Sequence, residues 1–177
     1  MQERAKLVRF EGEILPHLDA AYNLARWLLR NDHDAEDVTQ EACLRAYRFF
    51  EGFRGGNAKA WLLTVVRHAC FDWLKQNRSQ ESMTSFDELV HTPDAVGSCN
   101  TPESLALQAA NQRVLHAALA QLPIEFCEAL ILRELEGLSY KEISTVTDVP
   151  IGTVMSRLSR ARNLLLDILS THDQQEH

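Results

Sequence analysis

The sequence predicts an all-α protein with two small helical domains joined by a linker, the C-terminal domain being a helix-turn-helix. Apolar residues recur at helical spacing along most of the 177 residues, and Gly- and Pro-containing breaks separate the helices. A stretch without Lys or Arg divides the chain. These observations place the domains at residues 1–78 and 105–177 and the linker at residues 79–104.

Three helices are predicted in the N-terminal domain. The first covers about residues 11–30 and ends at a polar break, where Asp34 is suited to cap the second helix. The second helix ends near Gly52, before the pair Gly55-Gly56. The third spans about residues 58–77 and has one apolar face, made of Leu62, Val65, Val66, Ala69 and Trp73.

Charge is unevenly distributed along the chain, whose formal net charge is -7. Residues 51–78 carry five basic and two acidic side chains, a net of +3, and residues 149–166 carry three arginines and no acid. The linker carries five acids and no base, a net of -5. Short basic patches of this kind bind phosphate, although a solvated helix face has the same composition. We expect the acidic linker to be a flexible tether that folds over a basic patch in the free protein.

The C-terminal half contains the sharpest motif. Helical patterning covers residues 103–121, 123–136, 139–146 and 151–169. Ser139 and Glu142 fit a capping box at the start of the third of these helices, and the turn before Pro150 leads into the fourth. The expected core between these last two helices consists of Ile143, Val146, Val149, Val154 and Leu158. The last helix then presents outward Thr153, Ser156, Arg157 and Arg160. In a helix-turn-helix such a second helix enters the major groove; an ordinary helical hairpin is the alternative.

Outside its apolar face, the helix over residues 57–78 mixes large aromatics with cations. These other faces carry Trp61, Thr64, Arg67, His68, Phe71, Lys75 and Arg78. Bases stack on aromatic rings while cations hold phosphate, so this composition suits single-stranded nucleic acid. Considered alone, the helix favours the simpler interpretation that Trp61 and Phe71 complete the core.

Three segments together resemble the extracytoplasmic-function (ECF) group of bacterial sigma factors, and the resemblance covers about residues 10–169. The segments begin Asp34-Ala-Glu-Asp-Val-Thr-Gln-Glu, Phe53-Arg-Gly-Gly-Asn-Ala-Lys-Ala-Trp-Leu, and Leu132-Arg-Glu-Leu-Glu-Gly-Leu-Ser-Tyr. The last continues into Pro150-Ile-Gly-Thr-Val-Met-Ser-Arg-Leu.

The resemblance implies a set of sites. Residues expected to meet the β′ clamp helices of RNA polymerase are Asp34, Asp37, Gln40, Glu41 and Arg45. Residues expected to bind the melted minus-ten element are Asn57, Lys59, Trp61, Arg67, His68, Lys75 and Arg78. Residues expected to read the minus-thirty-five element are Thr153, Met155, Ser156, Arg157, Ser159 and Arg160. The resemblance also implies contact with the β flap and a cognate anti-sigma factor.

The chain departs from the family pattern at a few positions. His68 stands where many members have an asparagine that contacts a promoter base. Ser144 and Asp148 replace a small alanine and a turn glycine, but aspartate tolerates the left-handed conformation that such a turn needs. Phe126-Cys127 occupies a place where polar or basic residues are common, which is expected to alter packing or partner contact.

Other kinds of site find little support. Cys43, Cys70, Cys99 and Cys127 show no C-x-x-C spacing, no membrane span or secretory signal is present, and a reduced cytoplasmic protein is expected. The acids Glu36, Asp37 and Glu41 fit a solvated or partner-facing helix side better than acid/base catalysis. No metal, cofactor, small-molecule substrate or membrane contact is expected, and no enzymatic activity.

The sequence therefore predicts a promoter-recognition subunit of RNA polymerase that works by binding. Two other classes stay open: a helix-turn-helix regulator that binds duplex DNA without polymerase, and an interaction module that acts as a decoy for an anti-sigma factor.

Overall fold

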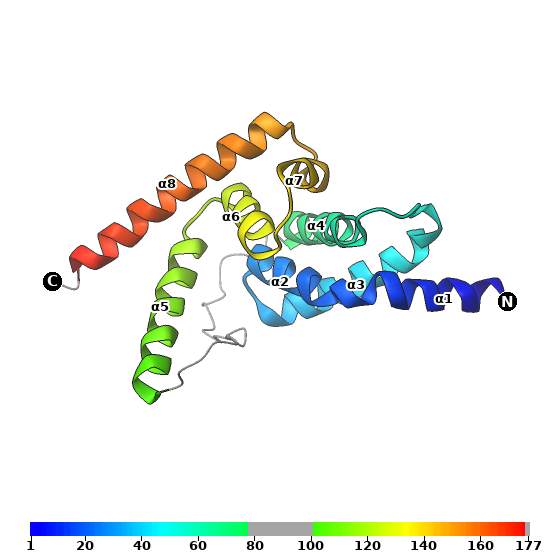
Figure 1. Ribbon diagram of the computed structural model, residues 1–177, viewed down its shortest axis with the longest axis horizontal. Coiled ribbons are helices and arrows are strands. Elements are labelled where there is room, and N and C mark those ends of the chain that lie inside the picture. Colours follow the sequence, from blue (N-terminus) through cyan, green and yellow to red (C-terminus); the bar gives the residue numbers. More distant parts are fainter. Residues whose placement is uncertain (78–100, 176–177) are drawn as a thin grey trace.

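The computed structural model describes residues 1–77 and 101–175, and all regular elements in these two ranges are helices (Figure 1). The predicted all-α fold is thus confirmed. Arg78 and the linker residues 79–100 lie outside the described residues, whereas the last linker residues, 101–104, including the acid Glu103, form the cap and first turn of α5. No helix in the described ranges is long and apolar enough to span a membrane.

The N-terminal half consists of four α-helices and two short 3₁₀ turns. The helices are α1 (Gln2–Glu13), α2 (Leu18–Leu29), α3 (Asp32–Phe49) and α4 (Ala58–Asn77), with η1 (Leu15–His17) and η2 (Phe50–Gly52) between them. Helix α1 was not expected, because only Phe10 in it is buried and its sequence has almost no apolar stripe. The cap of α3 is Asn31 rather than Asp34: Asn31 Oδ1 accepts from the Asp34 N–H at 3.0 Å.

The C-terminal half contains α5 (Pro102–Ala120), α6 (Ile124–Leu130), the π-helical turn η4 (Ile131–Leu135), α7 (Tyr140–Thr147) and α8 (Ile151–Gln175). Thr101 and Ser104 cap α5 reciprocally. Helices α7 and α8 form the predicted helix-turn-helix, and four of its five expected core residues are buried, with Val149 partly buried.

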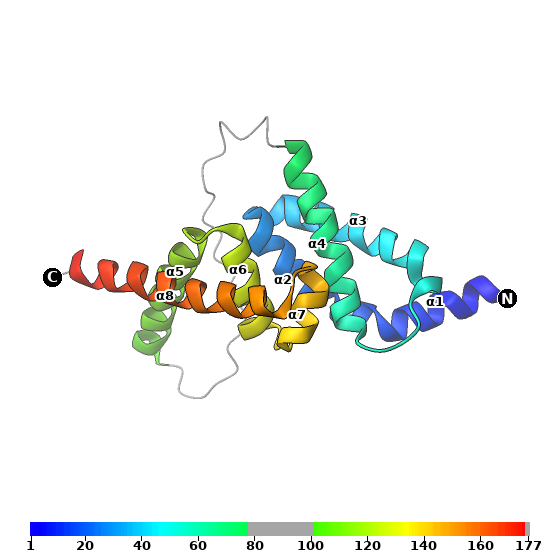
Figure 2. The ribbon, with the colours of Figure 1, turned by 90° about the horizontal axis from the view of Figure 1, so that it is seen from above.

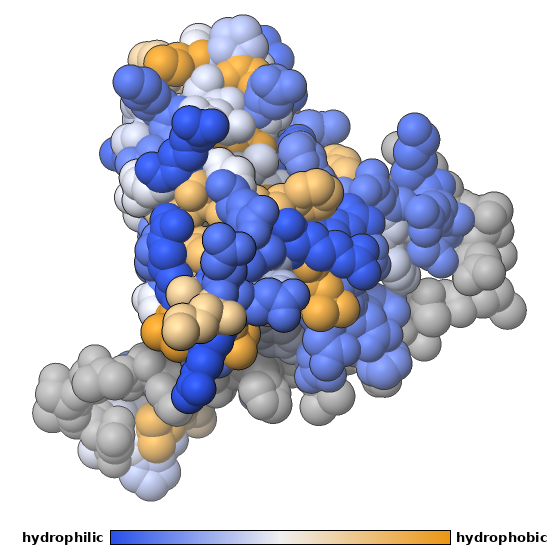
Figure 3. Space-filling model, turned by 90° about the vertical axis from the view of Figure 1, so that its right-hand side faces the viewer, coloured by the Kyte–Doolittle hydropathy of each residue, from blue (hydrophilic) through white to orange (hydrophobic). Residues whose placement is uncertain are grey.

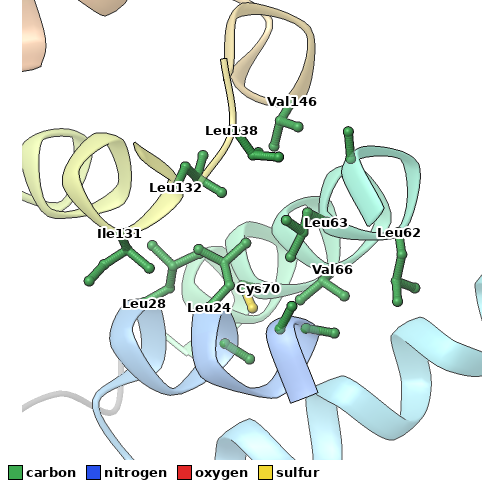
Figure 4. Packing of buried hydrophobic residues seen from close by; sticks show 14 of the residues in the cluster. Leu24, Leu28, Leu62, Leu63, Val66, Cys70, Ile131, Leu132, Leu138 and Val146 are labelled. Atoms are coloured by element: carbon green, nitrogen blue, oxygen red, sulfur yellow. The ribbon is translucent and has the colours of Figure 1, made fainter. Parts of the chain in front are cut away.

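The two halves share one hydrophobic core. Helix α4 packs on α7, and α2 packs on α6. Figure 4 shows Leu24 and Leu28 of α2, with Leu63 of α4, facing Ile131 and Leu132 of η4. These five side chains are almost fully buried. The halves therefore meet through a continuous apolar contact.

The shape follows from this contact. Helices α6 and α7 lie between the N-terminal helices and α8, while α5 and the last turns of α8 extend away on the far side (Figures 1 and 2). On the side of the molecule that carries the N-terminus, hydrophilic side chains predominate and hydrophobic ones form separate small patches (Figure 3).

Candidate polymerase and nucleic-acid interfaces

Helix α3 presents the residues expected to meet polymerase along one accessible side. Asp37, Gln40 and Glu41 are exposed, and Asp34 and Arg45 are half-buried. Arg45 is not a free cation, because its guanidinium donates to Glu41 at 2.6 Å and to Asp72 of α4 at 3.0 Å. These two hydrogen bonds raise the pKa of Arg45. The bridge ties α3 to α4 and holds Glu41 in place.

Two large apolar side chains on α3 were missed by the reasoning from sequence. Leu44 is 61% exposed and Phe49 is 68% exposed. Leu44 lies one turn from both Gln40 and Glu41 on the same helix side. Leu44 lies off the buried stripe of Val38, Ala42 and Ala46, which signals exposure in the sequence, whereas Phe49 lies at helical spacing from Ala46 and gives no such signal. An apolar side chain among acids is typical of a protein-binding surface.

The residues expected to bind the minus-ten element separate into two groups on and near α4. His68 and Lys75 are exposed, and Trp61 is half-buried against Phe50 and Phe53. The favoured interpretation of Trp61 as part of the core therefore holds for much of its ring. The second group, Asn57, Lys59 and Arg67, contacts the C-terminal half.

Each residue of this second group hydrogen-bonds a glutamate across the contact. Asn57 Nδ2 donates to Glu142 Oε2 at 2.8 Å. The ammonium of Lys59 lies 3.0 Å from Glu136 Oε2 and donates to the Glu136 carbonyl at 2.9 Å. The guanidinium of Arg67 forms an ion pair with Glu128.

Asn57 has a second role. Its Oδ1 accepts the Ala60 N–H at 3.1 Å and thereby caps the first turn of α4. The predicted capping box of α7 is present only in half. Ser139 Oγ accepts from the Glu142 N–H at 3.1 Å, but the Glu142 carboxylate turns to Asn57.

Glu128 is the most deeply buried charge of the described chain, with a relative exposure of 0%. Burial raises its pKa, while Arg67 and then Arg157 act in the opposite direction. Arg67 is itself enclosed, with its guanidinium over the Phe71 ring at 4.4 Å from the centroid. A carboxylate of the C-terminal half thus pairs with the arginine of α4, and the charge of Arg157 on α8 also acts on it.

The turn between α7 and α8 accommodates both departures from the family pattern. Asp148 adopts a left-handed conformation with φ 54°, as expected for aspartate in this place. The Ser144 hydroxyl donates to the Val149 carbonyl at 2.5 Å and so closes the turn. Phe126 and Cys127 contribute to packing, Cys127 being buried and Phe126 partly buried against the core.

The exposed side of α8 differs from the prediction at two positions, Thr153 and Arg157. Met155, Ser156, Ser159 and Arg160 are exposed, and Met155 is 52% accessible. Thr153 is half-buried. Arg157 was expected to point outward but is half-buried, because it lies one turn from buried Val154 and its charge acts on Glu128. The exposed surface near the start of α8 is therefore centred on Met155, Ser156 and Arg160.

The described residues offer nothing for metal or thiol chemistry. No group of His, Cys, Asp or Glu in these two ranges could hold a metal ion. Cys43, Cys70 and Cys127 are free thiols. Burial raises the pKa of Cys70 to about 12 and that of Cys127 to about 11, so neither is a reactive thiolate.

Comparison with known proteins assigns both halves of the chain. Residues 14–80 match the family model for Sigma-70 region 2, and residues 112–165 match that for Sigma-70 region 4. The ECF RNA polymerase sigma factor SigE of Mycolicibacterium smegmatis is 33% identical over 98% of this chain, which spans 66% of that relative. The ECF RNA polymerase sigma-E factor of Haemophilus influenzae is 34% identical over 80% of this chain and 77% of its own length.

Solved structures have the same fold. The sigma factor RpoE of Bartonella quintana, crystallised with the anti-sigma factor NepR, matches with a TM-score of 0.74 and 30% identity. The match covers 92% of this chain and 97% of RpoE. CnrH, solved with the cytosolic domain of CnrY, matches with a TM-score of 0.58 at 20% identity and supports the fold alone.

Proposed function

Because this chain belongs to the ECF group of RNA polymerase sigma factors, which direct core polymerase to promoters, we propose that it divides the task among three surfaces. The acidic side of α3 binds the polymerase clamp, α4 holds melted minus-ten DNA, and α8 reads the minus-thirty-five duplex. The observation that carries this proposal is the match of both sigma regions, in order, to the halves that present these surfaces.

The division of the chain supports the three roles. In this proposal the N-terminal sigma domain comprises residues 1–78, and the tether, expected at residues 79–104, ends where α5 of the duplex-reading domain begins at Pro102. Two DNA contacts on one tethered chain reinforce each other through effective concentration. Binding alone accounts for this activity, so no enzymatic step is assigned, and the protein works in the cytoplasm, where polymerase and promoters are found.

On α3, the exposed residues are the proposed contacts with polymerase. Asp37 and Glu41 supply charge, Gln40 a polar group and Leu44 apolar area within one patch. Asp34 and Arg45 support this patch from its edge, Arg45 through its bridge to Asp72. On α4, His68 and Lys75 are open to DNA, whereas Asn57, Lys59 and Arg67 first have to lose their glutamate partners.

An anti-sigma factor is the proposed regulator. RpoE of Bartonella quintana, 30% identical to this chain, binds the anti-sigma factor NepR. The likeness extends over both halves of this chain, so an analogous partner of this protein has both halves available to bind.

Run-off transcription with core polymerase tests the function. We expect initiation from a cognate promoter to depend on this protein, and the double variant Asp37→Lys/Glu41→Lys to lose polymerase binding by at least tenfold, since interface charges are costly to strand. The matched control, Glu3→Lys/Glu11→Lys, reverses two charges on α1 and should bind as the wild type does. Duplex binding without any polymerase-dependent initiation would favour a conventional regulator instead.

A further inference from the structure

We propose that Glu128, Glu136 and Glu142 of the C-terminal half occupy the minus-ten surface of α4 in the free chain, where they take the place of DNA. On this inference, single-stranded promoter DNA gains full access to α4 only after the two halves separate. The inference deepens the proposed function, because it rests on the assignment of α4 to the minus-ten element.

The three glutamates engage the minus-ten donors that face the C-terminal half: Lys59 and Arg67, which are largely enclosed, and Asn57, which is exposed at the start of α4. Asn57 meets Glu142, Lys59 meets Glu136, and Arg67 meets Glu128. The three acceptors come from different elements: Glu128 from α6, Glu136 from the segment after η4, and Glu142 from the first turn of α7. One local ion pair would be unremarkable, but three acids from three elements directed at one face form a matched surface.

Carboxylate oxygens satisfy the same donors that a phosphate would. Ammonium and guanidinium groups hydrogen-bond phosphate and carboxylate with similar geometry, and arginine forms two parallel hydrogen bonds with either. Arg67 shows this arrangement, since a second nitrogen, Nη2, lies 3.4 Å from Glu128 Oε2 in addition to the ion pair through Nε. Lys59 is held twice, by the carboxylate and by the backbone carbonyl of Glu136.

Burial makes the two states exclusive. The side chains of Glu128 and Glu136 are 0% and 7% exposed, and those of Lys59 and Arg67 are 28% and 15% exposed. A DNA strand therefore cannot reach Lys59 or Arg67 while the glutamates remain in place. The apolar core behind them, from Leu63 to Leu132, keeps the halves together without DNA.

The test is binding of a short fluorescein-labelled single-stranded DNA of mixed sequence to the full-length chain, followed by anisotropy. We expect Glu136→Gln/Glu142→Gln to raise affinity about tenfold, because a binding-competent state that is rarely populated lowers apparent affinity by its fraction. The matched control, Glu103→Gln/Asp167→Asn, removes the same net charge from exposed positions of the same half and should change affinity less than twofold. An equal gain in the control would overturn the proposal in favour of general electrostatics.

A third variant tests whether the gain in DNA affinity depends on Lys59 of α4. Lys59→Ala should have little effect in the wild-type chain, where Glu136 already holds the ammonium, but it should abolish most of the gain in the Glu136→Gln/Glu142→Gln background. If Lys59→Ala reduces affinity equally in both backgrounds, α4 is not covered in solution and the proposal is wrong.

Amide hydrogen exchange tests whether the two halves separate, and run-off transcription tests the proposed sigma function. Exchange along α7 should be faster in Glu136→Gln/Glu142→Gln than in the control double variant, and unchanged exchange counts against separation of the halves. If exchange and DNA binding rise as expected but the wild type supports no initiation, the sigma role fails and the covering of α4 stands.

Discussion

Helices α4 and α8 both carry basic side chains, but these side chains lie in different surroundings. On α4, Lys59 and Arg67 hold carboxylates of the other half and are largely enclosed. On α8, Met155, Ser156 and Arg160 are exposed, and Arg162 pairs with Glu134 of its own half. The comparison shows that basic residues on a helix do not by themselves define an open DNA site. What the neighbouring half places opposite them decides whether they are accessible.

The largest expected effect comes from breaking the buried pair on the α4 side. Arg67→Ala leaves the Glu128 carboxylate buried without its partner, which should lower the free energy of unfolding by about 3–5 kcal/mol. Urea denaturation of the full-length chain measures this loss. A loss below about 1 kcal/mol would mean that Glu128 is already hydrated in solution.

Replacing both Arg67 and Glu128 tests whether their ion pair adds net stability. The double variant Arg67→Met/Glu128→Leu removes both charges while keeping apolar volume, and such replacements are often neutral or stabilising. We expect it to recover most of the stability lost in Arg67→Ala. Recovery would show that the pair specifies how the halves meet rather than supplying net stability.

The exposed residues of α8 are tested by measuring base preference. Substitutions at Met155 or Ser156 should change binding at one or two base pairs of a randomised upstream element by about 1–3 kcal/mol. Arg160→Ala should instead weaken binding nearly equally across sequences and lower the salt slope by about one, as a phosphate contact does. Measurement on reconstituted holoenzyme at two salt concentrations distinguishes these roles. A change in base preference for Arg160→Ala alone would reverse them.

A smaller effect separates the two tasks of Asn57. Asn57→Ala removes both the cap of α4 and the contact with Glu142, and should lower stability by about 1 kcal/mol. Asn57→Ser keeps a capping oxygen but is too short to reach across to Glu142. The stability of Asn57→Ser should stay close to that of the wild type. Its affinity for single-stranded DNA should not fall either. If Asn57→Ser is as unstable as Asn57→Ala, the contact with Glu142 outweighs the cap.

The smallest effect is expected at the exposed pair between Arg162 and Glu134, which lie 2.8 Å apart on the α8 side. Exposed ion pairs contribute about 0–1 kcal/mol because water and salt screen them. Glu134→Gln should therefore leave the urea midpoint almost unchanged. A loss comparable with that of Arg67→Ala would remove the contrast between the enclosed and the exposed pair.

Local features of the fold were predictable because they depend on neighbours in sequence. The periodicity of residues 139–169 fixes the helix-turn-helix, and aspartate at position 148 is compatible with φ 54°. Asp34 was expected as the cap of α3, but Asn31 takes that place. Asparagine and aspartate are both favourable N-caps, so the sequence does not determine at which of the two residues the helix begins.

Contacts between the halves could not be predicted, because they join residues far apart in sequence. Glu128, Glu136 and Glu142 each look like an ordinary acid of an amphipathic helix or turn. Arg157 was placed outward from its spacing, and its position near the charge of Glu128 on another helix could not be inferred from that spacing. Helix α1 escaped notice because it buries one residue and so leaves no periodic signal.

The buried Glu128 also couples closure of the chain to proton uptake. Its pKa is raised in the folded chain by burial first and also by Glu125, against the opposing charges of Arg67 and Arg157, while the nearby Cys70 thiol stays neutral. A carboxyl whose pKa is higher when buried binds its proton more tightly in the closed form than in an opened or unfolded one. Closure should therefore strengthen as pH falls from above that raised pKa toward the ordinary value of glutamate, and Glu128→Gln should remove this dependence from urea titrations. Acidification would hold the halves together, so that a proton acts on this chain as an inhibitor of opening.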